Sequence, residues 1–146
     1  YAKRQKADES AAFTAAMLHD AAKYLDEKDF GYFIPTDVPE PVKHQFLGAY
    51  IAQSVLDVGD KDVINAIRYH TTGRPAMSTL EKIIFLADLL EQGRTFPEVD
   101  ELRKAVDDDF ERGFKLCVSR LYDYLSASGQ PVYYLTKQAK DYYENA

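Results

Sequence analysis

Apolar residues recur at spacings of three and four along most of this chain, and this periodicity is the feature that most restricts its fold. One clear stripe consists of Phe110, Phe114, Cys117, Leu121 and Leu125. Spacings of this kind place side chains on one face of an α-helix. Because no stretch alternates apolar and polar residues for long enough to predict a sheet, we expect an all-α fold. The length of 146 residues favours a single domain spanning 1–146.

Capping residues, glycines and prolines indicate where the helices begin and end. The pattern predicts helices over about 8–25, 42–56, 60–73, 78–93 and 98–128, and a last helix after Thr136. Ser78 and Glu81 have the spacing of a capping box, and the acidic run 107–109 should bend or break the fifth helix. Prolines and acidic residues in 26–42 predict a long loop, and the segment QPVYYL is expected to be extended.

The composition of the chain excludes several classes of protein. The 24 acidic residues outnumber the 18 basic residues, and the net charge of −6 argues against a nucleic-acid binder that relies on a positive surface. No apolar run approaches the roughly 20 residues of a membrane-spanning helix. Cys117 is the only cysteine, which excludes an internal disulfide and a thiolate cage. We expect Cys117 to be buried, and a cytoplasmic location fits this cysteine usage.

The three histidines carry the main functional signal. His19, His44 and His70 each fall on the apolar stripe of a different expected helix. A single inward histidine is more often a hydrogen-bonded core residue than a ligand. Three of them on three helices favour a common site, because imidazoles directed into a core need partners.

Two aspartates strengthen this interpretation. Asp20 directly follows His19, and Asp88 interrupts the apolar run IIFLADLL at the edge of its buried stripe. Burying such carboxylates without partners is costly, although a solvated helix edge could also accommodate Asp88. Helical bundles build two-metal sites by bringing imidazole and carboxylate groups together from separate helices. Without thiolates, this donor set suits iron, manganese, zinc or cobalt.

Several motifs resemble those of one enzyme family. The HD dipeptide at 19–20, the isolated His44 and His70, and the distant Asp88 are similar to the HD-domain metal-dependent phosphohydrolases. More narrowly, the chain resembles the YqeK family of bacterial symmetrical bis(5′-nucleosyl)-tetraphosphatases in the blocks MLHDAAKYL, RYHTTGRP, LEKIIFLADLLE, GRTFP and DYLSASGQPVYYLT. This resemblance implies a helical HD-domain bundle that hydrolyses diadenosine tetraphosphate to two ADP at a di-iron centre.

The same resemblance implies a set of metal ligands and a mechanism. The implied ligands are His19, Asp20, His44, His70 and Asp88, with Asp20 bridging two ions. Two closely spaced metals can hold a bridging hydroxide as the nucleophile and neutralise charge during in-line attack on phosphorus. Bound cations would also allow an acidic protein to bind a polyanionic dinucleoside polyphosphate.

Four further residues are candidates for contacts with substrate. Lys23, four residues after His19, could direct its ammonium group at a phosphoryl oxygen, or pair with a neighbouring carboxylate instead. Arg74 and Arg94 each follow a glycine at an expected helix end, where they could form a phosphate clamp or only complement the helix dipole. The hydroxyl of Thr71 could bind phosphate or the backbone.

Three functions are compatible with these residues. The first is metal-dependent hydrolysis of diadenosine tetraphosphate and related dinucleoside polyphosphates. The second is another HD-domain nucleotidase or phosphodiesterase, acting on nucleoside triphosphates or a guanosine alarmone. The third is a domain that binds a nucleotide or a partner without turnover. A homodimer is compatible with the sequence, which does not determine the oligomeric state.

The start of the chain departs from the family pattern. The family has a further histidine on a helix upstream of the HD pair, whereas none of the 18 residues before His19 is a histidine. The segment YAKRQK has the composition of a helix end, with a basic run suited to a helix C-terminus. We therefore expect that the natural protein has an additional N-terminal helix, which carries this histidine.

Overall fold

The computed structural model describes residues 1–146 as an all-helical protein without β-strands. Its elements are α1 (Glu9–Leu18), the short 3-10 helix η1 (Glu27–Phe30), α2 (Glu40–Ser54), α3 (Lys61–Tyr69), α4 (Thr79–Leu89), α5 (Val99–Asp108), α6 (Phe110–Ala127) and α7 (Tyr134–Glu144). The all-α prediction is therefore confirmed. No helix has both the length and the apolar character that crossing a membrane requires.

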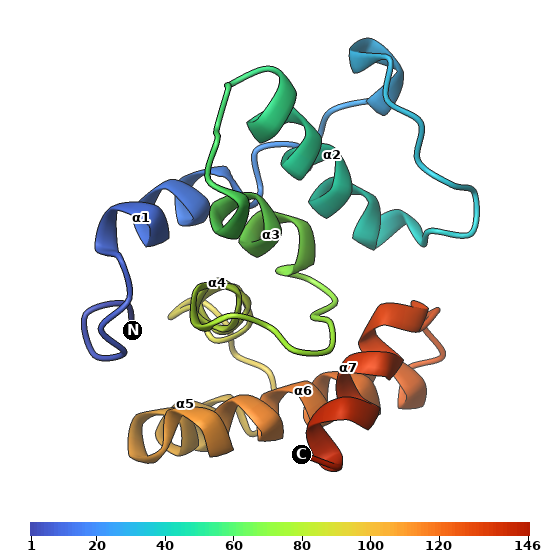
Figure 1. The fold of residues 1–146 in the computed structure, drawn as a ribbon. Helices are drawn as coiled ribbons and strands as arrows, with labels where there is room; N and C mark the ends of the chain where they lie inside the picture. The colour runs from blue at the N-terminus through green and yellow to red at the C-terminus, as the bar shows by residue number, and fades with distance from the viewer.

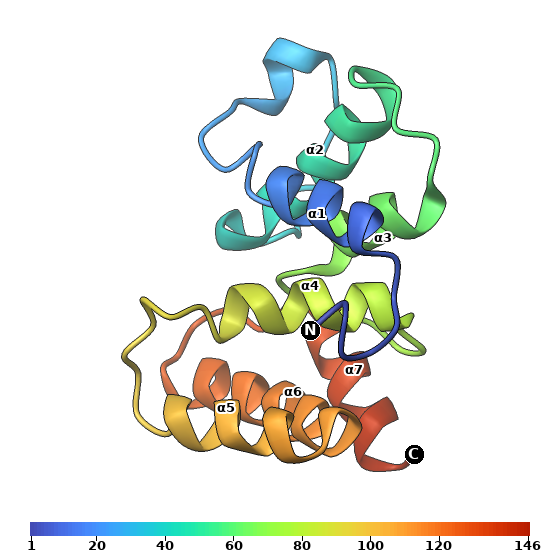
Figure 2. The same ribbon diagram turned by 90° about the vertical axis from the view of Figure 1, so that its left-hand side faces the viewer.

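Helix α4 lies in the middle of the molecule, between two groups of helices (Figure 1, Figure 2). The helices α1, α2 and α3 lie on one side of it, and α5, α6 and α7 lie on the other. On the first side α4 contacts α1 and α3, and on the second side it contacts α6. A strongly apolar helix thus joins the two halves of the fold.

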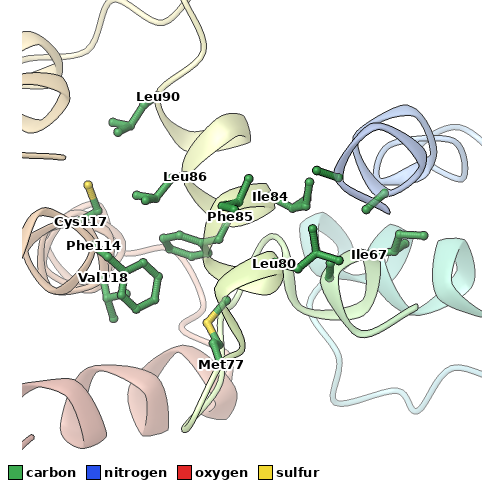
Figure 3. Close-up of a cluster of buried hydrophobic side chains, with 14 of the residues drawn as sticks. Ile67, Met77, Leu80, Ile84, Phe85, Leu86, Leu90, Phe114, Cys117 and Val118 are labelled. Atoms are coloured by element: carbon green, nitrogen blue, oxygen red, sulfur yellow. The ribbon is translucent and has the colours of Figure 1, made fainter. Parts of the chain in front are cut away.

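The main core forms around α4 and contains 24 buried residues. Figure 3 shows Phe85 directed toward Phe114 and Cys117 of α6, whereas Ile84 points to the side on which Ile67 of α3 lies. The rings of Phe85 and Phe114 meet edge to face, with centroids 5.6 Å apart. Cys117 is fully buried, as expected. Burial raises the pKa of its thiol to about 12.

Side-chain caps set several helix boundaries. The capping box of Ser78 and Glu81 is present at the start of α4, as predicted. Asp60 accepts two backbone N–H groups at the start of α3. Asp109 adopts an extended conformation between α5 and α6 and caps α6 by accepting from the Arg112 N–H. The predicted break in the 107–109 run is therefore confirmed, and it produces two helices.

The predicted end of the first helix is wrong by seven residues, and the predicted start of the last helix is wrong by about three. The first helix ends at Leu18 and not near Leu25. The chain after it turns more tightly, with the Lys23 N–H bonded to the Asp20 carbonyl, so that HD lies at the end of a helix and not inside one. The last helix begins at Tyr134, and Thr136 is buried in its first turn. Only the first four residues of QPVYYL, 130–133, therefore lie outside a helix.

The first residues form one helical turn. Lys6 has a left-handed conformation with φ of 54°. The N–H of Ala7 donates to the Ala2 carbonyl at 3.0 Å, and the N–H of Lys6 donates to the Lys3 carbonyl at 3.3 Å. This is the hydrogen-bond pattern of a Schellman helix end, in agreement with the helix-end composition of YAKRQK.

Candidate metal centre

The three histidines come together where α1, α2 and α3 meet. His19 directly follows α1, His70 directly follows α3, and His44 lies in the first half of α2. The Nε2 atoms of His44 and His70 lie 3.0 Å apart. The rings of His19 and His70 meet edge to face, with centroids 5.0 Å apart. Packing of α3 against both α1 and α2 brings these positions together.

Backbone carbonyls fix the orientation of two of the imidazoles. Nδ1 of His70 donates to the Ile67 carbonyl at 2.8 Å, and Nδ1 of His19 donates to the Ala16 carbonyl at 2.6 Å. Because a carbonyl can only accept, each Nδ1 carries a proton, and each neutral ring presents an Nε2 lone pair. Second partners of this kind orient histidines that bind metals.

Two aspartates complete the cluster. Oδ1 of Asp20 lies 3.3 Å from Nε2 of His44 and 3.7 Å from Nε2 of His70, and its Oδ2 lies 3.8 Å from Nε2 of His19. Oδ1 of Asp88, which α4 supplies, lies 3.9 Å from Nε2 of His19. Asp20 therefore faces all three imidazoles, and Asp88 approaches them from the central helix.

The donor set fits a divalent metal. Ligand atoms of His19, Asp20 and His70 all lie within 4.8 Å of one another. Burial, and next the neighbouring His70, lower the pKa of His44, so this ring is neutral at neutral pH and its nitrogen is available as a ligand. Imidazole nitrogen and carboxylate oxygen without thiolate match the metals expected from the sequence.

Lys23 and Thr71 reach the same cluster. Nζ of Lys23 pairs with Oδ2 of Asp20 at 2.9 Å, and Oγ1 of Thr71 lies 3.3 Å from Nε2 of His44. Lys23 arrives through the tight turn after α1 and not along a helical face. Its pairing with a carboxylate is present, and its contact with phosphate stays a prediction.

The two arginines of the expected clamp have different partners. Arg94 donates to Oδ1 of Asp88 at 3.1 Å, at the edge of the cluster. Arg74 donates to both carboxylate oxygens of Glu81, from Nε at 2.8 Å and from Nη2 at 3.0 Å. Glu81 is fully buried, and sequence reasoning recognised it only as a cap. The structure gives Arg74 no hydrogen bond to the cluster, while the other predicted site residues meet there.

Gln45 supports the site and was missed from the sequence. Its buried Oε1 accepts the N–H groups of Thr71 at 3.1 Å and Thr72 at 3.3 Å, and its Nε2 donates to the Thr72 hydroxyl at 3.1 Å. It therefore ties the residue after His44 to the turn after His70. The signal available in the sequence was the position of Gln45, a polar residue directly after the candidate ligand His44 on a buried helix face.

A cavity of about 810 Å³ adjoins the cluster. His70, Thr71, Asp88 and Arg94 form one part of its wall. The remainder includes apolar side chains from the α4, α5 and α6 side of the fold, among them Phe85, Leu89, Leu102, Cys117 and Leu121. This volume is within the range of pockets for small organic ligands, roughly 300–1,000 Å³. The candidate metal centre thus opens onto space for a small organic ligand.

Comparison with known proteins agrees with this geometry. Residues 1–93 match the HD domain family. A symmetrical bis(5′-nucleosyl)-tetraphosphatase of Bacillus subtilis is 37% identical over 141 residues, which cover 90% of this chain and 75% of that protein. The enzyme of the same name from Halalkalibacterium halodurans is 36% identical over 140 residues, with the same shares covered.

A solved structure shares the fold. The crystal structure of a predicted HD superfamily hydrolase involved in NAD metabolism, from Clostridium acetobutylicum, superposes with a TM-score of 0.88 at 36% identity. The match covers 99% of this chain and 81% of that chain. An HD domain implies a divalent metal, and the cluster of His19, Asp20 and His70 is placed to bind it. The chain belongs to the HD domain family and, within it, to the family of the symmetrical bis(5′-nucleosyl)-tetraphosphatases.

Proposed function

We propose that this chain hydrolyses dinucleoside polyphosphates, diadenosine tetraphosphate above all, symmetrically into two nucleoside diphosphates. The observation that carries the proposal is the meeting of three imidazoles and two carboxylates beside a cavity of nucleotide size. The names of the relatives from Bacillus subtilis and Halalkalibacterium halodurans supply the substrate class.

The proposed cofactor is a pair of divalent ions, with iron favoured and manganese, zinc or cobalt as alternatives. The proposed ligands are His19, Asp20, His44, His70 and Asp88. When bound, the ions would activate water and neutralise phosphate charge. The Nδ1 bonds of His19 and His70 to backbone carbonyls hold both rings with their lone pairs toward Asp20, so the chain offers these donors without rearrangement.

Cationic and hydroxyl groups around the cluster would bind the phosphate chain. The protein as a whole carries a charge of −6, so a polyanion needs local positive charge. The Lys23 ammonium lies 2.9 Å from Asp20, and the Arg94 guanidinium lies 3.1 Å from Asp88. Both can turn from a carboxylate to a phosphoryl oxygen, and Thr71 adds a hydroxyl donor. We assign these three side chains to orienting the substrate.

The reaction consumes one water for each substrate. Water adds to the second phosphorus of the chain of four, and the bond from that phosphorus to the bridging oxygen of the third one breaks. The water oxygen stays on the second phosphorus, its two protons pass to solvent or to the oxygen that leaves, and each product keeps two phosphates. Lys23 and Arg94 stand near the cluster as counter-charges for the oxygen that leaves.

Product analysis tests the proposal against the two other functions. The full chain is incubated with diadenosine tetraphosphate, nucleoside triphosphates or a guanosine alarmone, with added ferrous or manganese ion, and products are resolved by ion-exchange chromatography. We expect ADP as the sole product from diadenosine tetraphosphate. AMP plus ATP would contradict symmetrical cleavage, faster turnover of another nucleotide would favour a different HD nucleotidase, and binding without hydrolysis would favour a non-catalytic module.

A further inference from the structure

Arg103 of α5 binds the end of α4 and the following turn with a single guanidinium group. Its Nε donates to the Leu90 carbonyl at 3.1 Å, and its Nη2 donates to the carbonyls of Glu91 and Arg94, to the latter at 3.1 Å. Its Nη1 pairs with the Asp100 carboxylate at 2.7 Å. One side chain thus holds three successive points of the segment that leaves α4.

The segment that Arg103 binds has few other restraints. Helix α4 has no basic residue in its last turn, so its terminal carbonyls need a donor from elsewhere. Residues 91–95 are all exposed, which means that no buried side chain anchors them to the core. The N–H of Arg94 donates to the Glu91 carbonyl at 3.0 Å and closes the turn. Arg103 binds both ends of this turn.

The turn carries Arg94 to the candidate site. Its guanidinium lies 3.1 Å from Asp88 and 3.5 Å from Glu91, and it forms part of the cavity wall. We propose that Arg103 is a positioning residue, which holds the 91–94 turn so that Arg94 stays beside Asp88 and the cavity. This inference rests on the proposed function, because it takes Arg94 as a phosphate-binding group.

A purely structural role for Arg103 has different consequences. If its guanidinium only caps α4, its loss lowers stability and leaves the substrate affinity of the folded protein unchanged. If it positions Arg94, its loss weakens substrate binding, and this loss vanishes when Arg94 is already absent. A double-mutant cycle separates the two roles.

The experiment uses the full chain with Mn²⁺ and compares Arg103→Met, Arg94→Ala and the double variant. Arg112→Met, at an exposed position of α6, is the matched control. KM for diadenosine tetraphosphate and Kd for ADP are measured in parallel, and hydrogen exchange of 91–95 reports on the turn. We expect Arg103→Met to raise KM and Kd about tenfold and to speed hydrogen exchange in the turn. In the double variant, Arg103→Met should cause no further rise in KM or Kd beyond that of Arg94→Ala.

Each outcome decides the question. Unchanged constants in Arg103→Met, or losses that add to those of Arg94→Ala, overturn the positioning role while the proposed function stands. If Arg103→Met does not fold, Arg103→Lys enters the same cycle, because lysine keeps the charge but concentrates its donors at one point. A parent protein that neither hydrolyses the dinucleotide nor binds ADP overturns the proposed function and this inference together.

Discussion

The Nε2 atoms of His44 and His70 lie 3.0 Å apart across the contact between α2 and α3. Nδ1 of His70 donates to the Ile67 carbonyl, which directs Nε2 of this ring toward His44. Burial, and then His70 itself, lower the pKa of His44 and keep that ring neutral near pH 7. Neutral imidazole is the form that binds a metal. The two Nε2 atoms are thus close enough to act as ligands of one metal site.

A divalent metal should stabilise the folded chain. Mn²⁺ at a hundredfold excess over its Kd contributes about 2.7 kcal/mol to the free energy of unfolding, which is roughly 8 °C in Tm for a domain of this size. Scanning fluorimetry after chelation and readdition of metal measures this shift. His70→Ala and Asp88→Ala should still fold, lose most of the shift, and hydrolyse at least about a hundredfold more slowly.

Asp108→Ala is the matched control for Asp88→Ala. Asp108 is an exposed carboxylate at the end of α5. Its variant should keep both the thermal shift and the rate of the parent. Near-normal turnover of His70→Ala or Asp88→Ala with metal in place would show that the ligands are assigned wrongly.

Cys117 should be unreactive while the protein is folded. The side chain is fully buried against α4, and burial raises the pKa of the thiol to about 12. The thiolate is the reactive form, so at pH 8 a disulfide reagent should modify the native protein only as fast as it opens. In denaturant, one equivalent of the reagent should react with the Cys117 thiol at once. Rapid modification of the native chain would mean that the cavity wall exposes the sulfur.

The pair of Arg74 and Glu81 should matter chiefly for stability. Glu81 is fully buried, and Arg74→Met leaves its carboxylate without a counter-charge. Breaking such a pair should cost about 3 kcal/mol, at the lower end of the range for buried pairs because Arg74 is partly exposed. Urea denaturation measures this loss in the free energy of unfolding. The double variant Arg74→Met/Glu81→Met should recover part of the loss, whereas Lys137→Met in the exposed pair with Asp141 should change little.

A second variant of the same residue, Arg74→Ala, tests the predicted phosphate clamp. If Arg74 also binds substrate, Arg74→Ala raises KM for diadenosine tetraphosphate more than it changes the metal content of the protein. Steady-state kinetics and elemental analysis of the purified variant measure both quantities. Equal KM values for Arg74→Ala and the parent would remove Arg74 from the clamp and leave it with Glu81 alone.

Local sequence rules predicted the helices and the inward positions of the three histidines for the same reason. Hydrophobic periodicity identifies the buried face of each helix, so His19, His44 and His70 could be placed on inward faces before their contacts were known. The capping box at Ser78 and the break at Asp109 are also local features. Such signals depend only on residues within a few positions of one another.

The features that were missed depend on contacts distant in sequence. Gln45 binds the turn at Thr71, and Arg103 binds carbonyls from Leu90 to Arg94. The hydrophobic periodicity of the sequence cannot predict these hydrogen bonds, because they depend on how the helices pack against one another. The premature end of α1 has a similar origin. Leu18 is followed by Ala21, Ala22, Lys23 and Leu25, which have high helix propensity, yet the chain there turns and Asp20 faces three imidazoles.

Gly113 should be essential for the close packing of α5 on α6. A Cβ at this position would overlap the backbone of Val106 and lie 2.7 Å from the carbonyl carbon of Ala105. Backbone cannot move aside as a flexible side chain can, so Gly113→Ala should lower the free energy of unfolding by about 3 kcal/mol. Gly59→Ala is the control, because Gly59 has open space around it and no left-handed φ. Urea denaturation should find Gly59→Ala unchanged or slightly more stable; equal stability of both variants would mean that α5 and α6 lie farther apart.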